Sequence, residues 1–162
     1  MTEASARIDD LIVCAHHTAV CVDDFEAARE FYVQILGFKV EGEMDRRTDV
    51  AAVVGLPDAV IRWGMLSRGS YRVELFKYYS PEGRTDPVRQ CDRGYTHMAF
   101  EVKDVDAAYR RLVAAGYRTL SPPTELRGGI TKCVYVLAPE NNVTELVEFR
   151  KPNISSIGNP LR

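Results

Sequence analysis

The sequence predicts an α+β protein built from two paired modules, residues 11–80 and 94–150, each with elements in the order βαβββ. Three observations support this fold class. The apolar pattern changes from strand-like to helix-like and back in the same order in both halves. Residues of the first half recur 80 positions later, and a connection over 80–93 carries two prolines and six charged residues.

The first module begins with the apolar, valine-rich run Leu11–Val22, which predicts a buried strand. Asp23 or Asp24 can cap a following helix, because an aspartate oxygen accepts hydrogen bonds from the free N–H groups of the first turn. Helical spacing over 25–36 and a terminating glycine predict that helix. The other expected segments are a strand over 38–43, a loop with a short helix over 45–58, and a hairpin of strands 59–66 and 71–79.

The second module repeats this order. A strand over 96–102 precedes Asp104 as the helix cap, and helical spacing over 105–115 ends at Gly116. Three strands are expected after the helix, over 117–120, 132–137 and 143–149. The last two surround the turn 139–142, where we expect an asparagine to take the left-handed conformation. Residues 1–10 and 151–162 are expected to be tails.

The two modules share residues that are not apolar filler. His17 and Asp24 recur as His97 and Asp104, together with four small or apolar residues between them and just beyond. One deletion later, a helix-ending glycine recurs, and the last strand of each module carries a Glu–Leu pair at Glu74 and Glu145. Because the repeated residues include histidines and helix caps, duplication explains them better than chance.

Composition excludes several classes of function. The 162 residues carry a formal charge of −2 with 21 scattered basic residues, so the concentrated positive charge that nucleic acid requires is missing. No apolar leader opens the chain and no run approaches about 20 apolar residues, so we expect neither secretion nor membrane insertion. The four cysteines form no zinc-binding spacing, and Cys14 and Cys21 are expected in the core. The simplest setting is the cytoplasm.

Four residues form the candidate site. His17 and His97 lie on first strands, and Glu74 and Glu145 lie on last strands, at repeat-equivalent positions. Burying such groups is unfavourable unless they are paired or bound to a metal. Two neutral imidazoles and two carboxylates balance the charge of one divalent cation and suit Ni, Zn, Co, Mn or Fe.

Other residues are weaker candidates. Alternation along a strand places His16 on the face opposite His17, where a structural or exposed role is expected. The same alternation places Arg72 on the Glu74 face, which makes it a candidate for binding an anionic substrate. Trp63 is expected in the core. No nucleotide-binding glycine loop or nucleophile elbow is present.

Three segments resemble one family. HHTAVCVDDFEAAREFYVQILGF resembles the opening module of the vicinal oxygen chelate (glyoxalase/bleomycin resistance/dioxygenase) superfamily, and GYTHMAFEVKDVDAAYRRLVAAGY resembles its second module. GGITKCVYVLAPENNVTEL resembles its closing hairpin. The resemblance covers about residues 11–150, taken together as one domain. It implies paired modules that form a cup-shaped mixed sheet.

The resemblance also implies a site and a chemistry. The family's metal ligands fall on His17, Glu74, His97 and Glu145, a set most similar to that of glyoxalase I. It implies a lactoylglutathione lyase-like enzyme that removes a proton next to a carbonyl, with Glu145 or Glu74 as the base. The related methylmalonyl-CoA epimerases usually carry Gln where Glu74 stands.

The expected substrate is a small molecule, such as a thiohemiacetal or an acyl thioester, and a homodimer is expected because dimers are common in the family. The site can be completed within one chain or across two. Three alternatives stay open. They are an acyl-CoA epimerase of the methylmalonyl-CoA type, an extradiol-type dioxygenase, and a metal-free drug-binding protein of the bleomycin-resistance kind.

Overall fold

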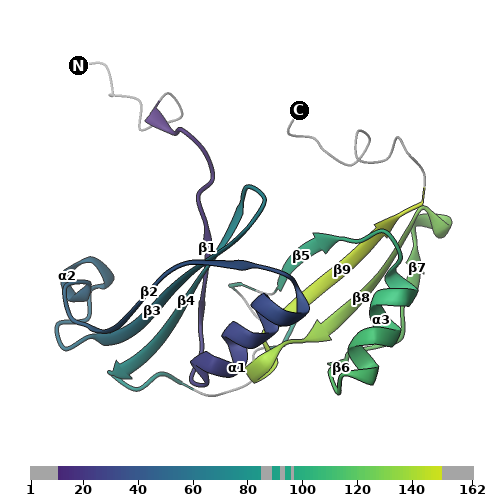
Figure 1. Ribbon diagram of the computed structural model, residues 1–162. Helices are drawn as coiled ribbons and strands as arrows, with labels where there is room; N and C mark the ends of the chain where they lie inside the picture. The colour runs from purple at the N-terminus through teal and green to yellow at the C-terminus, as the bar shows by residue number, and fades with distance from the viewer. Residues whose placement is uncertain (1–10, 85–88, 92–93, 96, 151–162) are drawn as a thin grey trace. The chain divides into compact units, whose positions relative to one another are not determined.

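The protein is described by a computed structural model that covers residues 11–84, 89–91, 94–95 and 97–150 (Figure 1). The expected α+β class is confirmed, with two sheets of mixed strand direction. The chain divides into two compact units, Met1–Glu82 and Gly83–Arg162, and each unit contains one of the sheets. The expected tails over 1–10 and 151–162 lie outside the described residues. None of the helices in the described ranges has the length and apolar character to cross a membrane.

The first unit forms a four-stranded sheet in the order β1-β4-β3-β2. Strand β1 runs parallel to β4, whereas β2 and β3, and β3 and β4, pair antiparallel. Its elements are β1 (Thr18–Cys21), α1 (Phe25–Glu30), the π-helical turn η2 (Phe31–Ile35), β2 (Lys39–Arg47), α2 (Ala51–Val54), β3 (Val60–Arg68) and β4 (Tyr71–Ser80).

The helix expected over 25–36 forms as α1, which begins at Phe25 and continues as the π-helical turn η2 to Ile35. The Asp24 carboxylate accepts a hydrogen bond from the backbone N–H of Ala27 at 3.0 Å. Phe25 and Phe31 are buried, so the helix presents an apolar side toward the unit's core. Gly37 then takes a φ of 72°, which a residue with a side chain adopts only under strain. The polar cap and the glycine therefore fix the length of the helix from the sequence.

The prediction of a buried strand over residues 11–22 is wrong in extent. Only Thr18–Cys21 forms a strand, and Val13 is 98% exposed. The register explains the late start. Thr18 pairs with Val73, and β4 itself begins only two residues earlier, at Tyr71. Residues before 16 therefore extend beyond the end of the strand that would pair with them.

The prediction that Cys14 and Cys21 are core residues is also wrong, because both are exposed. Cys14 precedes β1, in the segment that lies outside the sheet. Cys21 lies on β1, but alternation places it on the face opposite the buried Val20. An apolar run therefore indicated a strand without indicating which of its residues face the core.

The second unit repeats the parallel and antiparallel arrangement. The sheet order is β5-β9-β8-β6, with β7 also paired to β8, and β5 runs parallel to β9. Its elements are β5 (His97–Glu101), α3 (Val105–Ala114), β6 (Arg118–Thr119), β7 (Thr124–Leu126), the short 3₁₀ turn η3 (Arg127–Gly129), β8 (Thr131–Leu137), the 3₁₀ turn η4 (Pro139–Asn141) and β9 (Val143–Phe149).

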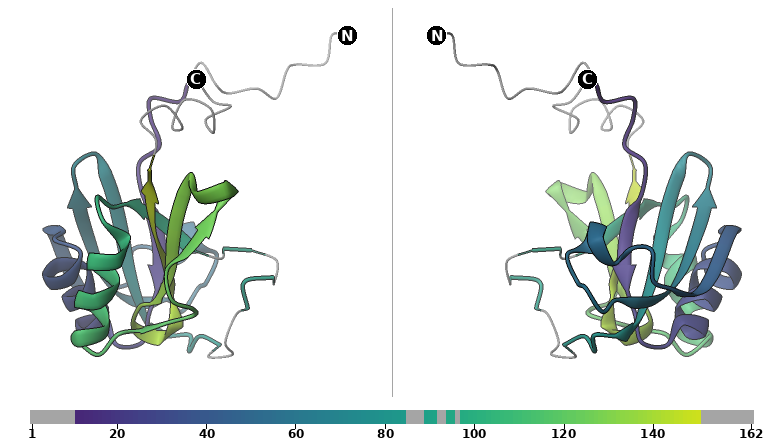
Figure 2. Two further views of the ribbon diagram at one scale, coloured as in Figure 1. Left: turned by 90° about the vertical axis from the view of Figure 1, so that its right-hand side faces the viewer. Right: turned by 90° about the vertical axis from the view of Figure 1, so that its left-hand side faces the viewer.

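Helix α3 packs against β8, β6 and β9 of this sheet, and the green helix and the yellow-green strands can be followed in the left view of Figure 2. Val105 and Leu112 of the helix pack with Val134, Val136 and Leu146 of the strands to form the unit's apolar core. Their burial leaves the opposite face of β8 and β9 to carry other side chains, because successive residues of a strand point to opposite sides.

Two local expectations for this unit differ from the structure. The strand expected over 117–120 shrinks to Arg118–Thr119, and an additional strand, β7, follows at Thr124–Leu126. Two consecutive prolines at 122–123 separate them, because proline has no N–H to donate to a sheet. In the turn before β9, Glu140 rather than an asparagine takes the left-handed conformation, with a φ of 60°.

Candidate functional site

The parallel strand pairs of the two units have the same register around the candidate residues. In the first unit Ala19 pairs with Glu74, and in the second Ala99 pairs with Glu145. Each histidine lies two residues before that alanine, and its side chain lies beside the glutamate that pairs with the alanine. The duplication seen in the sequence is therefore a duplication of geometry.

In the first unit the two side chains meet. The distance between His17 Nε2 and Glu74 Oε2 is 3.0 Å, with side chains 34% and 14% exposed. His17 lies one residue before β1, and Glu74 lies inside β4. A histidine just before the start of β1 thus contacts a carboxylate on the neighbouring strand β4.

In the second unit His97 and Glu145 repeat this contact. His97 Nε2 lies 3.2 Å from Glu145 Oε2, and the side chains are 27% and 18% exposed. The His97 ring packs against the ring of Tyr135, with 4.8 Å between the ring centroids. That packing limits the orientations that the imidazole can take.

Strand alternation had placed His16 on the opposite side from His17, and that prediction is wrong. The two Nδ1 atoms are 2.8 Å apart, within hydrogen-bond distance. Alternation fails here because both residues precede the strand, which begins at Thr18. One ring must donate to the other, and if His17 donates from Nδ1, its Nε2 carries a lone pair that can bind a metal.

The pair distances fit two adjacent ligands of one cation. Ligands bound at about 2.1 Å and separated by about 90° lie about 3 Å apart. The same distances also suit a direct hydrogen bond between the imidazole and the carboxylate. Within the described ranges, no group of three or more His, Cys, Asp or Glu side chains is arranged to hold a metal. Each unit by itself therefore supplies two donors.

Trp63 is a functional candidate that the sequence did not indicate. Its indole Nε1 donates a hydrogen bond to Glu74 Oε1 at 2.6 Å, and the side chain is only partly buried, so its placement in the core was wrong. The bond crosses from β3 to β4, where Trp63 pairs with Phe76, two residues beyond Glu74. Strand alternation within β3 could have revealed the shared face only once the register was known.

Cys133 occupies the corresponding position in the second unit. It pairs with Val147, two residues beyond Glu145, as Trp63 pairs with the residue two beyond Glu74. Burial raises the pKa of the Cys133 thiol, and the Glu145 charge and a hydrogen bond to that carboxylate raise it further. Trp63 thus donates a hydrogen bond to Glu74 from the adjacent antiparallel strand, and Cys133 holds the equivalent register position beside Glu145.

Two tyrosines add phenol groups near the glutamates. Burial, followed by the charges of Cys21 and Glu74, raises the pKa of Tyr78. Burial, followed by the charge of Glu145 and then that of Cys133, raises the pKa of Tyr135. Both phenols therefore stay protonated at neutral pH and can donate hydrogen bonds.

Arg72 lies on the expected face of β4 but has a partner. Its Nε donates to Glu41 Oε2 at 2.9 Å, and the two side chains are about one-third exposed. This bond raises the pKa of Arg72 and lowers that of Glu41. The role of Arg72 in binding a substrate remains a prediction.

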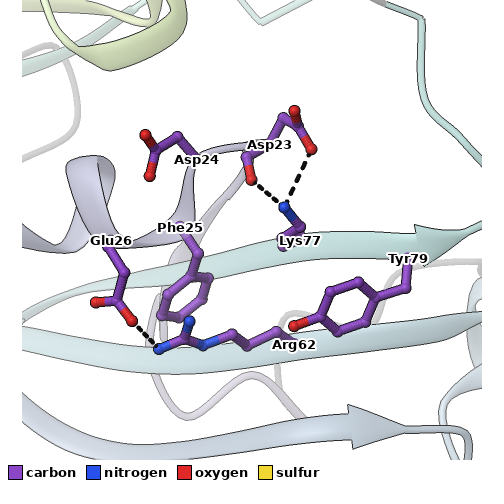
Figure 3. A pocket seen from close by; sticks show the side chains of 7 residues that line it. All are labelled: Asp23, Asp24, Phe25, Glu26, Arg62, Lys77 and Tyr79. Carbon is purple, nitrogen blue, oxygen red and sulfur yellow. Dashed lines mark hydrogen bonds and ion pairs between the residues drawn. The ribbon is translucent and has the colours of Figure 1, made fainter.

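A shallow pocket of about 340 Å³ lies elsewhere on the first unit, by the start of α1 (Figure 3). The Arg62 guanidinium lies over the Phe25 ring, 4.1 Å from its centroid, and donates a hydrogen bond to Glu26. Lys77 donates a hydrogen bond to the backbone carbonyl of Asp23. Lys77 is three residues from Glu74, so alternation places it on the other face of β4. The pocket is therefore separate from the His17–Glu74 pair.

Sequence comparison connects this geometry to known proteins. The family model described as Glyoxalase/Bleomycin resistance protein/Dioxygenase superfamily matches residues 15–146, which include both histidines and both glutamates. The chain belongs to this superfamily.

Relatives within the superfamily include enzymes with different named activities. A 2-epi-5-epi-valiolone epimerase from Actinomyces sp. is 32% identical over 85% of this chain and 80% of its own length. The human mitochondrial methylmalonyl-CoA epimerase is 28% identical over 84% of this chain and 72% of its own. A lactoylglutathione lyase from Pseudomonas putida is 27% identical over 82% and 83%. These relatives support an enzyme and leave its reaction open.

Solved structures of the superfamily share the fold. A glyoxalase family protein from Bacillus cereus matches with a TM-score of 0.78 at 20% identity, over 89% of this chain and 99% of that one. The trypanothione-dependent glyoxalase I of Leishmania major matches with a TM-score of 0.62 at 21% identity, over 89% and 92%. At these identities the likeness concerns the fold alone.

Proposed function

We propose that this protein is a divalent-metal-dependent enzyme that transfers a proton at a carbon next to a carbonyl group. His17, Glu74, His97 and Glu145 are the proposed ligands of one ion. The observation that carries the proposal is the repeated His–Glu pair, with Nε2–Oε2 distances of 3.0 and 3.2 Å at equivalent positions of equivalent strands.

The chemistry of the donors supports a cation. Two carboxylates and two neutral imidazoles offset a charge of +2 and suit Ni, Zn, Co, Mn or Fe. Glu74 accepts a further side-chain hydrogen bond from Trp63, and Cys133 holds the equivalent position beside Glu145. Such outer contacts orient the ligands of metal sites and fix which oxygen faces the ion.

Each group of the proposed site would have its own role in the proton transfer. A bound divalent ion would supply Lewis acidity toward the substrate's carbonyl oxygen. Glu145 or Glu74 would take the proton from the adjacent carbon and return it to the same or the neighbouring carbon. Positioned proton transfer of this kind contributes about 10²–10⁴ in rate. Tyr78 and Tyr135, which stay protonated, can hold substrate oxygens in place.

Two reactions share this proton transfer. In a glyoxalase I-type lyase the proton moves to the neighbouring carbon of a thiohemiacetal, and the product is a 2-hydroxyacyl thioester. In an epimerase a proton is removed from one face of the carbon, and a proton is added to the same carbon from the opposite face. The valiolone epimerase and the lactoylglutathione lyase both align with most of this chain, so both reactions stay candidates. The substrates to screen are therefore polyhydroxy ketones and acyl-CoA thioesters as well as glutathione thiohemiacetals.

Isotope exchange tests the proposal directly. The metal-loaded protein is incubated in D₂O with each candidate substrate, and NMR follows the C–H next to the carbonyl. We expect deuterium at that carbon with one substrate class, and loss of exchange when chelator removes the metal. A requirement for O₂ with Fe(II) would replace the proposal with a dioxygenase. Tight ligand binding by protein that takes up no metal would replace it with a drug-binding role.

A mixing experiment tests whether one chain or two complete the site. The His17→Ala and His97→Ala variants are inactive alone if both pairs hold one ion. When the two are unfolded and refolded together, a site shared between the chains of a homodimer gives one intact site per mixed dimer. A site within one chain stays inactive. Restored activity therefore assigns the site to two chains.

A further inference from the structure

Glu74 has two oxygens with different partners. Oε1 accepts the Trp63 indole N–H at 2.6 Å, and Oε2 lies 3.0 Å from His17 Nε2. A carboxylate held through one oxygen by a neutral donor keeps the other oxygen for a cation. The indole N–H donates only, so it cannot exchange roles with the carboxylate during a reaction.

The indole itself is held in place from two sides. Gly42 of β2 lies beneath the ring, and a Cβ at that position would be 3.5 Å from the nearest ring carbon. The Arg47 guanidinium lies 5.5 Å from the ring centroid, and Asp49 fixes that guanidinium through bonds of 2.7 and 3.0 Å. Trp63 is thus a supported donor rather than a freely rotating side chain.

The second unit offers an internal comparison. Cys133 stands toward Glu145 as Trp63 stands toward Glu74, but a thiol is a weak donor. The two glutamates of the repeat are therefore held with unequal strength.

We propose that Trp63 is a positioning residue that fixes Glu74 through Oε1, so that Glu74 offers a cation Oε2 alone and remains in place during turnover. This inference rests on the proposed function. It assigns different roles to two glutamates that the repeat makes look alike. Glu145, with the weaker thiol partner, is left as the carboxylate that can turn toward a substrate.

The test compares Trp63→Phe, which removes the N–H and keeps an aromatic ring, with Cys133→Ala at the matching position. Affinity for Co²⁺ is measured by calorimetry on metal-free protein, and the visible spectrum of the Co²⁺ form reports carboxylate coordination. We expect Trp63→Phe to weaken Co²⁺ binding by about 10–100-fold and to change the spectrum. Cys133→Ala should weaken it less, and Trp63→Phe should lower kcat more than it changes KM.

A second measurement uses the fact that Trp63 is the only tryptophan of the chain. Its fluorescence therefore reports the Glu74 contact in the wild-type protein, even if Trp63→Phe does not fold. We expect Zn²⁺ to shift the emission of the wild type but not that of Glu74→Ala. Zn²⁺ binding that leaves the wild-type emission unchanged would overturn the role of Trp63.

The outcomes separate the two proposals. If the wild type and Trp63→Phe bind Co²⁺ with the same affinity and spectrum, the Trp63 inference is wrong and the metal site stands. If the wild type binds none of Co²⁺, Zn²⁺, Ni²⁺ and Mn²⁺, the proposed function is wrong, and this role for Trp63 is overturned with it.

Discussion

The number of metal ions bound per chain shows whether the two His–Glu pairs bind one ion together or one ion each. Four ligands around one ion predict a stoichiometry of one, and removing either pair abolishes binding. Two independent pairs predict two ions, and His17→Ala then loses only one of them. Because each pair has only two donors, we expect one ion per chain, bound by all four side chains.

Binding of one ion at this site also predicts how much the metal stabilises the folded protein. A ligand at 100 times its Kd stabilises the folded state by about 2.7 kcal/mol. For a chain of 162 residues this corresponds to a rise in Tm of about 5–11 °C. We expect that rise for the wild type with metal relative to chelator, and none for His17→Ala or His97→Ala.

Elemental analysis and thermal denaturation measured on the same samples check this prediction. Protein is purified without a chelator or a histidine tag, stripped, and reloaded with Ni²⁺, Zn²⁺, Co²⁺ or Mn²⁺. Cys91→Ser, which changes an exposed cysteine that is not among the four proposed ligands, serves as a control. Two ions per chain, or half of the thermal gain in a single-histidine variant, would refute the reasoning that joins the pairs at one ion.

Three further outcomes follow from single contacts. Glu145→Gln keeps the shape of the side chain but removes the base, so kcat should fall about 10²–10⁴-fold in steady-state kinetics while metal binding persists; an unchanged kcat would exclude Glu145 as the base. Leu146→Ala truncates a side chain that is 3% exposed and should cost about 2–5 kcal/mol in urea unfolding; a loss below about 1 kcal/mol would contradict its place in the core. Lys132 lowers the pKa of Asp106, so this pair stabilises the fold above the ordinary aspartate pKa and loses that contribution as the pH falls through the lowered value. Unfolding of Lys132→Met should therefore depend less on pH in that acidic range, and equal pH profiles for the two proteins would argue against the ion pair.

The two His–Glu pairs of the candidate site could be predicted because they depend on repetition rather than on contacts. His17 and His97 were identified by position, and the strand register then brought each beside its glutamate. Helix caps were equally accessible, since an aspartate cap bonds an N–H only three residues away. Local chemistry of this kind can be inferred from the sequence alone.

The contacts that the sequence missed all depend on register. Trp63 reaches Glu74 because β3 and β4 pair with Trp63 opposite Phe76, and no local pattern specifies that offset. The start of β4 at Tyr71 likewise determines where β1 begins, so apolar character alone predicted too long a strand. His16 was misplaced for the same reason, because alternation holds only within the paired part of a strand.

The parallel pairing of first and last strands also makes each His–Glu pair a measure of complete folding. In the sequence, His17 lies near the start of the first unit and Glu74 lies near its end. The strands β2 and β3 come between them along the chain. A unit that has assembled only its central hairpin holds a glutamate without its histidine. Metal uptake during refolding would therefore report the pairing of β1 with β4. These two strands are the paired strands of the unit that lie farthest apart along the chain.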